Sequence, residues 1–86
     1  MNFDLLLQQI DEGKFNKLSS DKLKELKHTT EEMIHTCDEL VTLNELCDKM
    51  DCDISEASTY DTLISDQLHY SLIINKLLIE SMDVLN

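Results

Sequence analysis

The sequence has no proline, no tryptophan and no arginine, and its only glycine is Gly13. Tight hairpin turns in β-proteins depend on glycine, often within Asn-Gly or Asp-Gly pairs, and neither pair occurs here. Leucine, lysine, glutamate, isoleucine and aspartate dominate the 86 residues instead. The composition therefore predicts an all-α protein, and the length fits a single helical domain over residues 1–86.

Positive charge is scarce: seven lysines stand against 18 acidic residues, which gives a net charge of −11. Arginine is the usual residue for reading phosphates and base edges, so its absence and the negative charge argue against direct nucleic-acid binding. The charge is also uneven, since residues 31–66 hold eleven acids and only Lys49. That segment is either a solvated surface or a negative surface that docks on a basic partner.

Cysteine is present but odd in number, because three cysteines cannot all pair within one chain. This count is typical of a reducing compartment. The N-terminus has no basic stretch of the kind that opens a secretory signal. The most apolar run, residues 72–79, is interrupted by Asn75 and Lys76 and is too short to span a membrane. We therefore expect a cytoplasmic protein.

Hydrophobic spacing predicts a short helix over residues 2–12, followed by Gly13 where a left-handed residue commonly ends a helix. A long second helix is expected to begin with Ser20 as its N-cap. Its apolar residues advance in steps of three and four, which is a heptad seam. The pattern Thr29-x-x-Glu32 resembles an internal capping box and allows a break there. The seam comprises Leu23, Leu26, Thr30, Met33, Cys37, Leu40, Asn44 and Cys47.

A third helix is expected to follow a connection over residues 50–58, with the capping pattern Ser58-x-x-Asp61 at its start and an end near Leu85. The predicted fold is thus three helices, of which the second and third form a long antiparallel hairpin beside the short first helix. On a helical projection, five charged or strongly polar residues of the third helix fall within an arc of only about 60°. They are Ser65, His69, Lys76, Glu80 and Asp83.

Apolar residues populate nearly all the rest of the third helix, and a helix that is apolar most of the way round has to be buried most of the way round. One short helix and one narrow seam are too little to cover it in a chain this small. We therefore predict a homo-oligomer, most simply a dimer, or a protein partner on this surface. The candidate partner-binding residues are Leu72, Ile73, Leu78, Ile79 and Met82.

Two motifs resemble half of a carboxylate-bridged metal site, namely Glu32-x-x-His35 and Asp66-x-x-His69. Glu32 and His35 lie off the seam and His69 lies in the polar arc, so both motifs are expected to face water. Further inward glutamate ligands are also missing. The three cysteines, Cys37, Cys47 and Cys52, fit no zinc-finger spacing, and two of them sit on the seam as small apolar residues.

A calcium loop that began at Asp51 would need glycine at its sixth position and glutamate at its twelfth, but Glu56 and Thr62 stand there. The sequence has no glycine-rich phosphate loop and no base suitably placed to activate a cysteine. We therefore predict no catalytic residue, no metal site, no cofactor and no required disulfide.

Two stretches resemble a small lysis-inhibition accessory protein of T-even phages, a cytoplasmic antiholin. They are Asp11-Glu12-Gly13-Lys14-Phe15-Asn16-Lys17-Leu18 and the segment from Asp53-Ile54-Ser55-Glu56 to Tyr60-Asp61-Thr62-Leu63. The resemblance spans most of the chain and rests on overall appearance without a diagnostic motif. It implies a protein of the host cytoplasm that binds the cytoplasmic segment of a holin, and it transfers no functional residue.

The predicted function is non-enzymatic regulation through protein–protein binding, with the apolar third helix as the binding surface. Lysis inhibition through a holin is its specific form. The alternative is an acidic decoy that mimics a nucleic acid and inhibits a nucleic-acid-binding host protein, in which case the acidic segment of residues 31–66 is the working surface.

Overall fold

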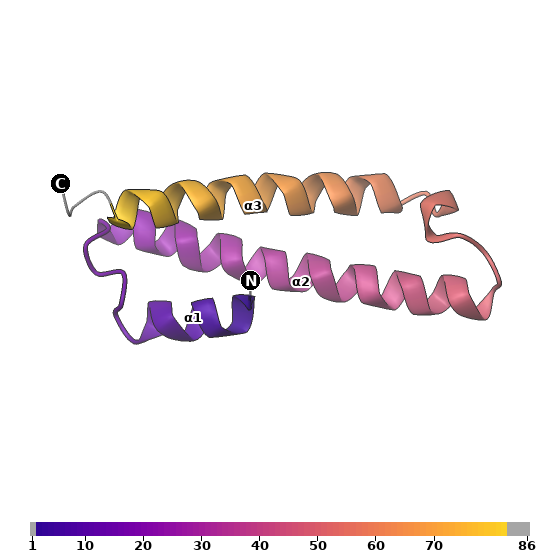
Figure 1. Ribbon diagram of the computed structural model, residues 1–86, viewed down its shortest axis with the longest axis horizontal. Coiled ribbons are helices and arrows are strands. Elements are labelled where there is room, and N and C mark those ends of the chain that lie inside the picture. The colour runs from indigo at the N-terminus through magenta and orange to yellow at the C-terminus, as the bar shows by residue number, and fades with distance from the viewer. Residues whose placement is uncertain (1, 83–86) are drawn as a thin grey trace.

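The structure, a computed structural model, describes residues 2–82. It contains α1 (Phe3–Asp11), α2 (Ser20–Lys49), the short 3-10 helix η1 (Ile54–Glu56) and α3 (Tyr60–Met82), and no strand occurs within this range. α2 and α3 run antiparallel as a long hairpin, and α1 lies beside the half of α2 that is nearer its N-terminus (Figure 1). The predicted all-α fold, with a long hairpin and a short N-terminal helix, is confirmed.

The molecule is elongated, with extents of 52 × 20 × 18 Å and a radius of gyration of 15.7 Å. A compact domain of this length would have a radius of gyration of about 12 Å. The length comes from α2, whose 30 residues form one continuous rod. An elongated two-helix hairpin buries less of each helix than a globular bundle does, so much of the surface of α3 stays exposed.

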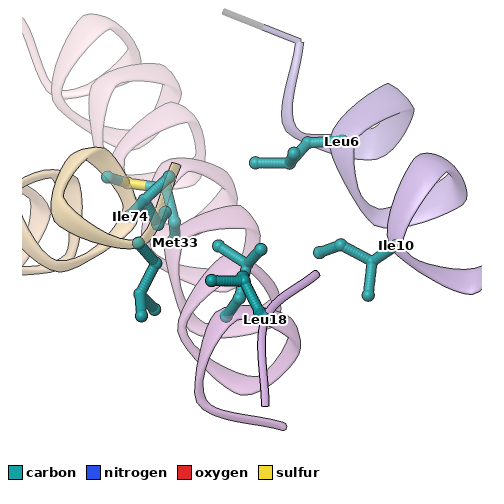
Figure 2. Packing of buried hydrophobic residues seen from close by; sticks show 7 residues of the cluster. Leu6, Ile10, Leu18, Met33 and Ile74 are labelled. Carbon is teal, nitrogen blue, oxygen red and sulfur yellow. The ribbon is translucent and has the colours of Figure 1, made fainter. Parts of the chain in front are cut away.

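The hydrophobic core is concentrated at the end of the hairpin that α1 covers. Leu6 and Ile10 point from α1 toward α2, where they meet Leu18 and Met33, and Ile74 closes the cluster from α3 (Figure 2). Leu26 and Leu77 complete this cluster. Beyond α1 only two helices remain, and the buried apolar residues there are Cys47 and Leu63. The far end of the hairpin therefore has a thin core.

The ends of α1 and α2 show why the chain turns where it does. Asn2 caps α1 by accepting a hydrogen bond from the Leu5 amide at 3.1 Å, and Gly13 follows with a φ of +79°, as predicted. Ser19, not Ser20, is the N-cap of α2, because its backbone is extended and its Oγ accepts from the Lys22 amide at 3.3 Å. The sequence assignment was wrong by one residue since both serines satisfy the capping pattern.

The break that the sequence allowed within α2 does not occur, and the start of α3 differs from the predicted one. α2 continues without a break through Thr29 and Thr30, which are buried, and the Thr30 hydroxyl donates to the Leu26 carbonyl at 2.7 Å within the helix. α3 begins at Tyr60, later than the Ser58 capping pattern suggested, because η1 and a turn occupy the preceding residues. Its predicted end near Leu85 lies outside the described residues.

The predicted seam of α2 faces the other helices over most of its length. Its members from Leu23 to Leu40 are buried or half-buried, and Cys47 is buried, but Asn44 is exposed. Polar contacts also join the helices. Lys27 pairs with Asp11 of α1 at 3.1 Å, and the side-chain amide of Gln67 on α3 donates to the Cys37 sulfur at 3.4 Å.

Candidate functional site

α3 has three faces in the structure. Leu63, Ile74 and Leu77 point into the hairpin and are buried. Ser65, His69 and Lys76 belong to the predicted polar arc and are exposed. Glu80 of the same arc is half-buried, because Lys22 of α2 reaches it. Between the buried face and the polar arc runs a third face, which is both apolar and exposed.

This third face is the candidate site, and we call it the outer stripe. Its residues follow one another at helical steps of four, four, seven and three, so they line one side of α3, with the exposed Asn75 between Leu72 and Ile79. The side chains of its central and C-terminal members are 60–65% exposed, which is high for large apolar groups. The outer stripe consists of Ile64, Leu68, Leu72, Ile79 and Met82.

One edge of the outer stripe opens into a groove where all three helices meet. The groove has a volume of about 420 Å³ and is lined by residues of α1, α2 and α3. Ile64 and Leu68 belong to both the outer stripe and the groove, so the two form one continuous surface. The other lining residues are Phe3, Met33, Gln67 and Ser71.

The residues that the sequence singled out for partner binding divide into two groups. Leu72, Ile79 and Met82 lie on the outer stripe. Ile73 and Leu78 are half-buried and pack against the core cluster, so they contribute to stability. Ile64 and Leu68 belong to the surface but were not singled out. The four-residue steps from Ile64 through Leu68 to Leu72 were the signal that could have found them. Partner binding by these residues stays a prediction.

The charges around the outer stripe differ between its two ends. Near Met82, a shallow depression includes Lys14 and Lys17 of the connection between α1 and α2. Toward Ile64, the hairpin carries the acidic segment, in which nine acids of residues 31–61 are exposed. These exposed acids are Glu31, Asp38, Glu39, Glu45, Asp48, Asp51, Asp53, Glu56 and Asp61.

The acidic residues also affect the phenol of Tyr70, which lies between α2 and α3. Burial raises the pKa of Tyr70 above its usual value, and the neighbouring carboxylates of Asp66, Glu32 and Glu39 raise it further. The Tyr70 hydroxyl therefore stays protonated at neutral pH. It behaves as a half-buried polar group at the α2–α3 interface and not as a base.

The sequence motifs with metal-ligand residues do not converge. His35 and His69 are exposed as expected, whereas Glu32 and Asp66 are half-buried instead of facing water. His35 Nε2 lies 2.7 Å from Glu39 Oε1 one turn away on α2, so its partner is a neighbour on its own helix. Within residues 2–82, no group of three or more His, Cys, Asp or Glu side chains is placed to hold a metal ion.

Cys37 is half-buried and Cys47 is buried, in agreement with their seam positions, and Cys52 is exposed. Among the helices of residues 2–82, none combines the length and apolar character needed to cross a membrane. Comparison of the chain with known protein families, with curated proteins and with solved structures gives no match. The outer stripe and its adjoining groove are therefore the features from which a function is argued.

Proposed function

We propose that this protein is a non-enzymatic regulator that binds a partner protein through the outer stripe of α3. The observation that carries the proposal is the row of exposed apolar side chains along one helix, continuous with an apolar groove. Single exposed apolar residues are normal on a protein surface, but several of them along one side of a helix are typical of an interaction site.

The shape and charge of the surface favour an amphipathic helix as its occupant. A partner helix reads a long apolar row through anchors at positions i, i+3, i+4 and i+7, and the outer stripe has the matching spacing. The acidic segment beside Ile64 and Leu68 favours basic residues on the polar side of that partner helix. The site thus suits a basic amphipathic helix, with its apolar side against Leu68 and Leu72.

The resemblance to the lysis-inhibition accessory protein supplies a specific form of the proposal. In that form the protein is a cytoplasmic antiholin, and the partner helix belongs to the cytoplasmic segment of a holin. The resemblance supports this form, and the exposed apolar surface supports partner binding in general.

A synthetic peptide with the cytoplasmic segment of a T-even phage holin tests the proposal directly. Titration of the full chain into the labelled peptide, followed by fluorescence anisotropy, is expected to show saturable binding. Leu72→Ser and Ile79→Ser are each expected to weaken binding about tenfold, the typical effect of losing an interface anchor. His69→Ser, on the polar arc of the same helix, is the matched control and is expected to bind normally.

The acidic decoy is the second candidate, and the nine exposed acids of the hairpin favour it. The decoy would bind through the acidic segment and not through the outer stripe, so reversing acidic charges distinguishes the two proposed functions. Under the leading proposal, Glu39→Lys with Glu45→Lys lowers affinity only modestly, and binding persists in high salt. If the double reversal and about 1 M salt abolish binding to the native partner, while folded Leu72→Ser binds normally, the decoy is correct.

A further inference from the structure

α2 ends in a turn that brings two cysteines close together. The Cys52 amide donates to the Cys47 carbonyl at 3.0 Å, and the Asp51 amide donates to the Asp48 carbonyl at 3.3 Å. Asp51 has a φ of +54°, in the left-handed region. These two hydrogen bonds and the left-handed residue between them define a Schellman motif, in which Cys47 and Cys52 are the two residues whose side chains usually touch.

The side chains of this pair are close enough to influence each other. Burial raises the pKa of the Cys47 thiol above its ordinary value, and the neighbouring Cys52 thiol and the charges of Asp48 and Asp53 raise it further. Apolar residues ordinarily occupy these two positions of the motif. Here the two positions hold a buried cysteine, Cys47, which is 4% exposed, and an exposed one, Cys52.

We propose that Cys47 and Cys52 form a dithiol site that low-molecular-weight disulfides convert to an intramolecular disulfide. The Schellman hydrogen bonds already hold the two residues at adjacent points of the turn. Disulfides require their Cα atoms to lie about 4–7 Å apart, and the 3.0 Å hydrogen bond from the Cys52 amide to the Cys47 carbonyl keeps the two backbones close. Cys37 is excluded, because ten residues of continuous helix put it about 15 Å along the axis from Cys47.

The order in which the two thiols react follows from the difference in their exposure. The Cys52 thiolate attacks one sulfur of the small disulfide, whose S–S bond breaks and releases one small thiolate. The Cys47 thiolate then attacks the Cys52 sulfur of this mixed disulfide and releases the second small thiolate. The two protein thiols lose two protons and two electrons, and the small disulfide gains them as two thiols, so the exchange balances.

The charge around Cys47 and Cys52 determines which small disulfides react fastest with them. Asp48, Asp51 and Asp53 flank the pair and are exposed, so a negatively charged reagent is repelled. A cationic disulfide such as cystamine is therefore expected to react faster than the anionic disulfide of glutathione. The difference is expected to shrink at high salt, where the carboxylates are screened.

The test uses the full chain and cystamine at about pH 8. The remaining thiols are then trapped with N-ethylmaleimide. Lys49 lies between the two cysteines and Glu39 lies between Cys37 and Cys47. Digestion with trypsin and a glutamate-specific protease therefore separates all three. The expected product is a pair of peptides joined through Cys47 and Cys52, with Cys37 carrying the maleimide.

The same reaction in concentrated urea shows whether the fold creates the site. The folded chain is expected to form the bridge roughly tenfold faster than the unfolded chain, because the turn holds the two cysteines close together. The proposal is overturned if Cys52 stops at the mixed disulfide, if Cys37 takes part in the bridge, or if the unfolded chain reacts equally fast.

Discussion

Lys22 Nζ lies 2.7 Å from Glu80 Oε2, and this ion pair joins the first turn of α2 to the last turn of α3. It lies at the open end of the hairpin, where no loop connects α2 to α3. The Glu80 carboxyl is half-buried, and its hydrogen bond with Lys22 lowers its pKa against the opposing effect of burial, with help from the charges of Lys22 and Lys76. The pair therefore fixes how the two helices meet at this end.

Replacement of Glu80 by glutamine is expected to lower stability at neutral pH and to change its pH dependence. The folded-state pKa of Glu80 lies below its ordinary value of 4.5, so the charged form is favoured by folding. Its contribution is full above pH 4.5 and is lost as the pH falls through the lower folded-state value. Urea unfolding of both proteins across this range should show a difference that closes on the acid side. A constant difference would contradict the assignment.

Gly13 and Asp51 both lie at left-handed positions, and substitutions at these two residues are expected to have opposite effects on stability. Gly13→Ala is expected to cost about 1 kcal/mol, because a side chain at φ +79° is strained, although no atom lies within 4 Å of the added Cβ. Gly13→Asn should cost less, since asparagine tolerates this region. Asp51→Gly is expected to raise the melting temperature, since it relieves the same strain at φ +54°. Thermal melts measure all three.

Leu26 on α2 is buried and Leu72 on α3 is exposed, so substitution of these two leucines is expected to affect stability differently. Leu26 is fully buried, so Leu26→Ala is expected to reduce the free energy of unfolding by about 2–5 kcal/mol. Leu72 is 62% exposed in the single chain, so Leu72→Ala should change the free energy of unfolding of the monomer, in dilute protein at low salt, by no more than about 0.5 kcal/mol. Urea titrations give both values. Equal losses would mean that the outer stripe is buried in the free protein, as in a dimer.

Self-association is expected to be visible by light scattering as a species larger than the 10.0 kDa monomer. The outer stripe is the surface on which a second copy would pack. A net charge of −11 on each copy opposes this, so dimerisation should strengthen as salt is added. The double variant Leu68→Ser with Leu72→Ser is expected to remain monomeric in the same salt. A clean monomer of the natural chain at every concentration would leave a separate partner protein as the occupant.

Much of the fold could be read from local pattern. The lack of proline, the single Gly13 and the three- and four-residue spacing predicted three helices, and the structure has them. Boundaries were less accurate where two residues offered the same chemistry. Ser19 and Ser20 can each cap a helix, and only the extended backbone of Ser19 decided between them.

The candidate site was predicted only in part. The apolar excess of the third helix was evident, but the division of its residues between core and surface was not. Ile73 and Leu78 belong to the core cluster, whereas Leu68 joins the outer stripe. This division depends on the rotation of α3 about its axis, which the contacts with α2 and α1 fix.

By itself, the sequence determined the helical class, the length and order of the helices, the acidic central segment and the excess of apolar surface, because each depends on residue type and spacing along the chain. Only the tertiary structure decided which apolar residues stay exposed, since α1 covers just one end of the hairpin. It also decided the pairing of Lys22 with Glu80. These two residues are far apart in sequence, and only the packing of α3 against α2 brings their charges together.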